Sequence, residues 1–201
     1  PLSAQPRCFN AMLRRIPHNL QVLAFEDGPF TSPQGLKATR AVVLGVLMRG
    51  SQIRRLLTGW VQVDGIDATD RMLQMAQPFS KGLAAIMFHG LPHAGFNVVD
   101  AKRLSRELDR PVLTVLGVKP RREAVEAALR KHFVDWEYRL SILDAVGPPL
   151  PFETSHGSVS YYQAVGINGE SAEALIRSLT VFGKVPEPLR TARLLADVFP
   201  T

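Results

Sequence analysis

Cysteine is almost absent from this sequence, since Cys8 is the single copy in 201 residues. One cysteine cannot close a disulfide within the chain, and it cannot build a cysteine-based zinc cluster. Long hydrophobic runs are also missing, because the longest, Ala41–Met48, is far shorter than the ~18 residues of a membrane span. The N-terminus has no continuous apolar stretch of the kind that a signal peptide carries. We therefore expect a cytoplasmic protein without a membrane partner, either metal-free or holding a metal through carboxylates.

Several catalytic signatures are absent as well. The sequence contains no phosphate-binding P-loop and no GxGxxG dinucleotide fingerprint. It has no GxSxG motif, so Ser/His/Asp catalysis has no support. His89 and His93 are four residues apart, but Gly90 and Pro92 exclude the regular helix that would aim both at one zinc ion.

Positive charge, by contrast, is in excess. Lys and Arg number 24 against 18 Asp and Glu, which gives a formal net charge of +6. The arginines gather in small groups, such as Arg14 with Arg15, and Arg49 with Arg54 and Arg55. Each group alone is compatible with a solvated surface, but together they favour nucleic acid as the partner. Arg49, Arg54 and Arg55 are the expected contacts to a DNA backbone.

The start of the chain carries arginine and is interrupted by Pro6 and Pro17, which predicts a basic N-terminal arm (1–19) before a single domain (20–201). Three strands with short connections open that domain, at Gln21–Phe25, Thr39–Met48 and Arg54–Val63. Their order predicts an antiparallel meander, whose second strand is apolar throughout and therefore buried on both faces.

Helices and strands alternate after the meander. The expected elements are a helix at Ala68–Gln77, a strand at Leu83–Phe88, a helix from Asn97 to about Asp109, a strand at Pro111–Leu116, a helix at Arg121–His132, and two last helices at Glu170–Val181 and Pro188–Val198. This rhythm predicts parallel strands joined by crossover helices. The order is that of the ribonuclease H-like α/β fold, with a mixed five-stranded sheet, flanking helices and a helical C-terminal region.

Carboxylates crowd the junction between the third strand and the first helix, in VQVDGIDATD (61–70). Asp64 and Asp67 stand there, while Asp27 ends the first strand. If the two strands are neighbours, these three acids converge into the oxygen ligand set that Mg²⁺ prefers. The competing interpretation is structural, with Asp67 as a helix N-cap, Asp70 in the first helical turn and Asp27 in a turn. Asp70 is best explained by this structural role.

A second candidate site is the loop HGLPHAGFN (89–97), which follows the expected strand at Leu83–Phe88. Open α/β sheets commonly place ligand-binding loops at this position. His89 and His93 are candidates for contact with phosphate or for general acid–base catalysis. Asn97 is the expected N-cap of the next helix and a candidate contact to nucleic acid.

Six segments carry a family resemblance: FEDGPF (25–30), VLGVLMRG (43–50), VQVDGIDATD (61–70), HGLPHAGFNVVD (89–100), KPRREAVEAALRKHF (119–133) and YYQAVGI (161–167). Through them the chain resembles the domain of unknown function 99 family, which is mostly archaeal and is also described as endonuclease dU-like. The resemblance implies a fold similar to endonuclease V, which is ribonuclease H-like. It also implies a metal-dependent DNA endonuclease that acts in DNA repair beside a deaminated base, with deoxyuridine as the proposed target.

The resemblance also assigns residues. It matches Asp27 to the first-strand aspartate of endonuclease V-like enzymes, and Asp67, or else Asp64, to the acid near the first helix. His89 stands where endonuclease V has a third aspartate, and a histidine ligand favours Mn²⁺ or softer ions over Mg²⁺. We therefore expect Asp27, Asp64 and Asp67 to hold Mg²⁺ or Mn²⁺, with Asp27, Asp67 and His89 in the chemistry. The alternatives are a noncatalytic nucleic-acid-binding protein that keeps the fold and, more remotely, a phosphohydrolase of nucleotides or small molecules.

Overall fold

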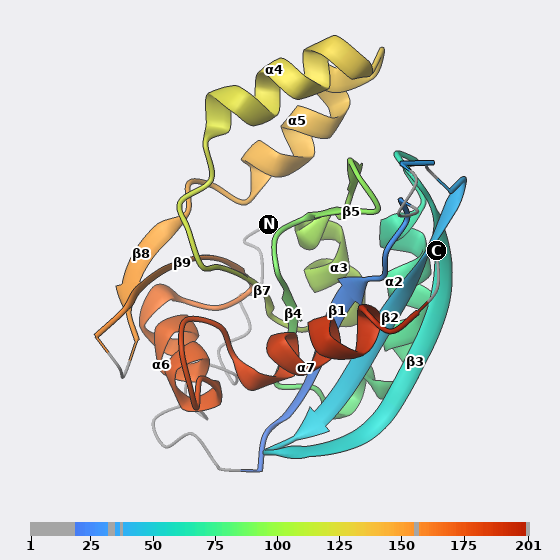
Figure 1. Ribbon diagram of the computed structural model, residues 1–201. Coiled ribbons are helices and arrows are strands. Elements are labelled where there is room, and N and C mark those ends of the chain that lie inside the picture. Colours follow the sequence, from blue (N-terminus) through green and yellow to red (C-terminus); the bar gives the residue numbers. More distant parts are fainter. Residues whose placement is uncertain (1–18, 32–34, 37, 155–156, 200–201) are drawn as a thin grey trace, which may run out of the picture.

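The computed structural model describes residues 19–31, 35–36, 38–154 and 157–199. Its centre is a seven-stranded mixed sheet in the order β3-β2-β1-β4-β7-β9-β8 (Figure 1). The strands are β1 (Gln21–Asp27), β2 (Arg40–Arg49), β3 (Gln52–Gln62), β4 (Ala85–Phe88), β5 (Pro92–His93), β6 (Asn97–Val98), β7 (Val112–Leu116), β8 (Leu150–Glu153) and β9 (Val159–Val165). The helices are α2 (Ala68–Ala76), the 3₁₀ helix η1 (Gln77–Gly82), α3 (Ala101–Leu108), α4 (Arg122–His132), α5 (Trp136–Ala145), α6 (Gly169–Leu179) and α7 (Glu187–Ala196). The predicted arm over 1–19 lies, except for its last residue, outside the described residues.

The predicted antiparallel meander is confirmed. β1 pairs with β2 from Gln21–Arg49 to Asp27–Val43, and β2 pairs in turn with β3. Every residue of β2 except the two at its ends is buried, as expected of an apolar strand inside a sheet. β3 forms one edge of the sheet, and most of its residues are exposed.

The predicted parallel strands are also present. β4 lies parallel to β1, and β7 lies parallel to β4, with α2 and α3 on the crossovers. β3, β2, β1, β4 and β7 together form the expected ribonuclease H-like mixed sheet. β9 and β8 extend it beyond β7 by antiparallel pairing.

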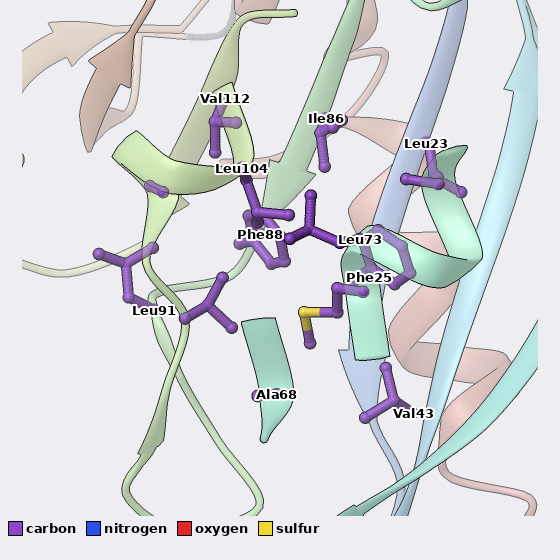
Figure 2. Close-up of a cluster of buried hydrophobic side chains, with 14 of the residues drawn as sticks. Leu23, Phe25, Val43, Ala68, Leu73, Ile86, Phe88, Leu91, Leu104 and Val112 are labelled. Carbon is purple, nitrogen blue, oxygen red and sulfur yellow. The ribbon is translucent and has the colours of Figure 1, made fainter. Parts of the chain in front are cut away.

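Helices cover both faces of the sheet, with α7 crossing β1 and β2 on one face and α2 and α3 packed on the other (Figure 1). Alternation along β1 sends Leu23 and Phe25 toward α2 and α3, and Val22 and Ala24 toward α6 and α7. Figure 2 shows the first of these clusters, in which the rings of Phe25 and Phe88 stack with centroids 5.7 Å apart. This packing fixes the ends of β1 and β4 side by side.

Two α-helices differ from the expectation. The helix predicted to begin at Asn97 has Asp100 as its N-cap, whose carboxylate accepts from Arg103 N, while Asn97 lies in the short strand β6. The helix α5 was not expected, because its apolar residues do not form a one-sided stripe. Together α4 and α5 form a helical hairpin that stands away from the sheet (Figure 1). Within the part of the chain that the structure describes, no helix is long and apolar enough to cross a membrane.

Candidate active site

Asp27 and His89 meet at the same edge of the sheet. Asp27 is the last residue of β1, and His89 directly follows β4. β1 and β4 run parallel, with Phe25 opposite Phe88. The residues that follow these two positions, including Asp27 and His89, therefore lie at the same end of the sheet. The parallel pairing of β1 with β4 thus places Asp27 near His89, whereas the first and third strands, whose adjacency was the condition for Asp27 to meet Asp64 and Asp67, are separated by β2.

An open depression of about 420 Å³ lies at this edge. Its lining comes from the end of β1 and the following turn, from the residue after β4, and from α7: Glu26, Asp27, Gly28, Pro29, Phe30, His89, Arg193 and Asp197. The depression thus combines three carboxyl groups, one imidazole and one guanidinium with an apolar wall.

Glu26 is a largely buried acid of the depression. Its Oε2 is buried and has no hydrogen-bond partner among the described residues. Burial, reinforced by the neighbouring Asp27, raises the pKa of Glu26 to about 8, with Arg193 acting in the opposite direction and Asp197 adding to the rise. A buried carboxyl oxygen without a partner is a vacant acceptor, which a cation or a substrate proton would satisfy.

His89 is held toward its neutral form. Burial lowers the pKa of its imidazole, and the nearby Arg193 and His93 lower it further. A neutral imidazole offers a lone pair, so it can accept a proton or bind a metal at neutral pH.

A short hairpin formed by β5 and β6 fixes the orientation of Asp27. The backbone N–H of Ala94, in the turn of this hairpin, donates to Asp27 Oδ2 over 2.7 Å. Charge-assisted hydrogen bonds of this kind are short and strong. The carboxylate of Asp27 is therefore held through one oxygen by the protein itself.

Asp64 and Asp67 hold backbone in place. Asp64, at φ 59°, accepts from Phe96 N through Oδ1 over 2.9 Å, and its own N–H donates to Ala94 O. Asp67 Oδ1 accepts from the amide of Asn97 at 2.7 Å and from Gln62 N at 3.1 Å. Neither acid lines the depression that contains Asp27 and His89. Among the described residues no group of three or more His, Cys, Asp or Glu is arranged as a metal ligand set, so the three predicted ligands are not gathered into one.

The cap expected from Asp67 is supplied by another residue. Asp67 precedes α2 but makes no side-chain cap bond, and Asn97 Oδ1 instead accepts from Ala68 N at the start of that helix. Asn97 reaches α2 from 29 residues further along the chain. Asp70, assigned to the helix start, pairs with Arg103 at 2.7 Å on the surface.

His93 and Asn97 require a correction, because both were expected to contact nucleic acid. His93 is 2% exposed and Asn97 is 0% exposed. The ring of His93 packs edge-on against Phe88, and its Nδ1 lies 3.1 Å from Leu91 O. Their side chains are part of the packing beneath the site and offer no surface to DNA.

The three arginines expected to bind the DNA backbone lie at the other end of the sheet. Arg49 pairs with Gln21, six positions before Asp27 on β1, which is about 20 Å along the strand. Arg54 and Arg55 are exposed at the start of β3, close to that end. These side chains are available to a long DNA duplex but do not border the depression.

The structure adds four residues that the sequence reasoning did not select. Glu26 could have been selected from the sequence because it precedes Asp27 in FEDGPF. Arg193 and Asp197 could have been selected because they are four residues apart near the end of the chain, a spacing that places both on one side of a helix. Arg139 carries no such signal. Its guanidinium donates to the backbone carbonyls of Gly65 and Phe96 from the unexpected helix α5.

The depression offers donors of the kinds that bind a divalent cation. The carboxyl groups of Glu26 and Asp27 and the imidazole of His89 line the depression and are of the O and N types that Mg²⁺ or Mn²⁺ binds, but they too are not arranged as a ready set of three ligands among the described residues. The carboxylates of Asp64 and Asp67 are instead engaged with N–H donors.

Comparison with known proteins places this geometry in context. The profile of the endonuclease dU family matches residues 18–199. A UPF0215 protein of Thermococcus sibiricus is 40% identical over 188 residues, which span 92% of this chain and 95% of that protein. A solved protein of unknown function from Archaeoglobus fulgidus has a TM-score of 0.77 at 28% identity, over 88% of this chain and 96% of that chain. Ciona intestinalis endonuclease V, solved with DNA that contains an inosine followed by a ribo-adenosine, has a TM-score of 0.52 at 13% identity, over 89% and 84%. This last likeness confirms the ribonuclease H-like fold.

Proposed function

Since the chain belongs to the endonuclease dU family, we propose that it is a cytoplasmic, metal-dependent endonuclease that nicks DNA beside a deaminated base, with deoxyuridine as the target. The observation that carries the proposal is the meeting of Asp27, Glu26 and His89 at one open depression. DNA as partner is supported by the net charge of +6 and by the DNA-bound endonuclease V of the same fold. A role in DNA repair follows from that choice of target.

Asp27 and Glu26 would hold Mg²⁺ or Mn²⁺. When bound, such an ion supplies charge stabilisation at a phosphodiester and a more acidic water. Asp27 contributes a carboxylate that the Ala94 N–H already orients, so little of its freedom remains to be lost on binding. Glu26 contributes the buried oxygen that has no partner among the described residues.

The remaining residues of the depression act on the substrate. His89, whose pKa is lowered by burial, accepts the proton of the attacking water at Nε2 or Nδ1. Arg193 faces the same space and stabilises the charge of the scissile phosphate. Asp64 and Asp67 take positioning roles in this scheme, since their carboxylates hold the loops around residues 62–66 and 94–97.

The test is nicking of duplexes that carry one deoxyuridine, one inosine or no lesion, with Mg²⁺, with Mn²⁺ and with a chelator. We expect metal-dependent nicking of the deoxyuridine duplex, and a loss of about 10²-fold or more in Asp27→Asn. Asp70→Asn is the matched control, because Asp70 pairs with Arg103 on the surface outside the depression and should cut as the wild type does.

One observation favours a second candidate, a noncatalytic nucleic-acid-binding protein. No group of three or more His, Cys, Asp or Glu among the described residues is arranged as a ready-made metal ligand set. Salt-dependent binding of every duplex, without nicking under any metal, would establish that alternative. Turnover of free nucleotides alone would instead identify a phosphohydrolase.

A further inference from the structure

We propose that Arg139, on α5, is a positioning residue that holds the β5–β6 hairpin in the place where it orients Asp27. The proposal rests on the proposed function insofar as Asp27 is catalytic. It assigns a role to the helical hairpin α4–α5, for which the sequence alone indicates no role.

The α4–α5 hairpin is an insertion between β7 and β8. Both of its connections contain glycine and proline, at Gly117 and Pro120 on one side and at Gly147–Pro149 on the other. α4 packs mainly on α5, and α5 is the helix that reaches β6. Its attachment to the site runs through the side chains of α5 and through Phe133, between the two helices, whose ring packs edge-on against Phe96 with centroids 5.6 Å apart.

Arg139 supplies hydrogen bonds to this attachment. Its side chain is 6% exposed, although arginine is seldom so buried without partners. Nη1 donates to Gly65 O over 2.8 Å and to Phe96 O over 2.6 Å, while Nε donates to Asp135 Oδ1 over 2.9 Å. The guanidinium also lies over the ring of Phe133, 4.3 Å from its centroid.

The two carbonyls that Arg139 binds belong to two loops that meet at the site. Gly65 is next to Asp64, whose carboxylate accepts from Phe96 N. Asp64 N donates to Ala94 O, and Ala94 N donates to Asp27 Oδ2. A continuous series of hydrogen bonds thus runs from the guanidinium, through both loops, to the candidate catalytic carboxylate.

Arginine suits this task because its planar guanidinium presents several donors in fixed directions. One Nη bridges two carbonyls from separate loops, while Nε binds Asp135 on the same helix. Lysine has a single nitrogen on a flexible stem and cannot reproduce this arrangement. Loss of Arg139 would leave both carbonyls without their donor and free the hairpin to shift.

The amide proton of Ala94 reports this arrangement directly by NMR, because its hydrogen bond to Asp27 moves it downfield. We expect Arg139→Gln to move the Ala94 resonance toward its position in Asp27→Asn, and to speed hydrogen exchange of residues 94–97 at least tenfold. With deoxyuridine DNA, kcat should fall about tenfold while KM changes little. Arg139→Lys should lie between the two.

The control is Arg122→Gln, because Arg122 ties α4 to α5 through its ion pair with Asp144 and pairs with Glu126 on α4 itself, all within the helical hairpin. It should leave the Ala94 resonance and kcat unchanged. An Ala94 resonance that moves in Asp27→Asn but not in Arg139→Gln or Arg139→Lys overturns the proposal. The Ala94 resonance is recorded without DNA. If the wild type does not cut DNA, the proposed function is refuted, but the NMR result still tests the positioning role of Arg139. If Arg139→Gln does not fold, Arg139→Lys and Asp135→Asn provide the same readout.

Discussion

The backbone N–H of Ala94 donates a 2.7 Å hydrogen bond to the carboxylate of Asp27, although 67 positions separate the two residues. The bond joins the end of β1 to the hairpin that follows β4. Its consequence is that the orientation of Asp27 depends on the hairpin, and the hairpin depends on Asp64, Asn97 and Arg139. Substitutions at these positions, and at the glycine beside Ala94, make each dependence measurable.

Gly95 should not tolerate a side chain. It lies at φ +85°, and a Cβ there would collide with Asp64 Oδ1. We expect Gly95→Ala to lower the free energy of unfolding by about 2–4 kcal/mol, through backbone strain and the displaced carboxylate, and to abolish nicking. Urea denaturation and the nicking assay measure the two effects.

The control for Gly95 is Gly183→Ala. Gly183 also has a positive φ, +72°, but no atom of the described residues lies within 4 Å of its added Cβ. It should show only the backbone cost, about 1 kcal/mol, with normal nicking. Equal effects of the two substitutions would show that contact with Asp64 plays no part.

Asn97 should contribute to stability far more than a surface asparagine does. Its buried amide binds Gln62 O, Asp67 Oδ1 and Ala68 N. Asn97→Ala leaves these groups without their partner, so we expect a loss of about 3 kcal/mol or more. Asn168→Ala, which removes the exposed N-cap of α6, should cost about 1 kcal/mol. Urea midpoints of both variants decide the comparison, and similar losses would contradict it.

The raised pKa of Glu26 predicts a pH dependence of stability in metal-free buffer. The pKa of Glu26 is about 8 in the folded protein, whereas in the unfolded chain it is near 4.5. Between these values unfolding releases a proton, so the stability contribution of Glu26 falls as pH rises, by up to about 1.4 kcal/mol per pH unit. Glu26→Gln carries no such proton. We expect the urea midpoint of the wild type to drop relative to that of Glu26→Gln as the pH rises from 5 to 8. If the two midpoints change in parallel with pH, the pKa of Glu26 is not raised in the folded protein.

Arg49, Arg54 and Arg55 remain proposed contacts to the DNA backbone, at a distance from the chemistry. Replacing all three by Gln should weaken binding of lesion and lesion-free duplexes alike. The slope of log K against log salt should become shallower by about one for each phosphate that the variant no longer neutralises. Arg103→Gln is the control, because Arg103 already pairs with Asp70 and Glu107. Fluorescence anisotropy at several salt concentrations measures the slopes, and an unchanged slope in the triple variant would exclude these contacts.

The fold was predictable because its signals are local. The wholly apolar run in β2 and the alternation of helix and strand after it predict the meander and the parallel strands without tertiary information. The helix α5 escaped prediction because it has no one-sided apolar stripe. Its key residue, Arg139, is polar and buried, and only the partners it finds in space explain that burial.

The candidate site was predictable only in part. Asp27 and His89 could be placed because strand ends and parallel pairing are readable from sequence. The roles of Asp64 and Asp67 could not, since a carboxylate that binds a metal and one that accepts from backbone N–H groups look the same in a sequence. Asn97 shows the same limit, because it caps α2 from across the fold although its position in the chain suggests the cap of the next helix.

The account assigns metal binding to Asp27 and backbone positioning to Asp64 and Asp67. The most direct test is a crystal structure of the protein soaked in Mn²⁺, with anomalous scattering used to locate the ion. We predict a peak beside Asp27 in the depression that Glu26 and His89 also line, and none between Asp64 and Asp67. A peak coordinated by Asp64 and Asp67, with none beside Asp27, would contradict the account.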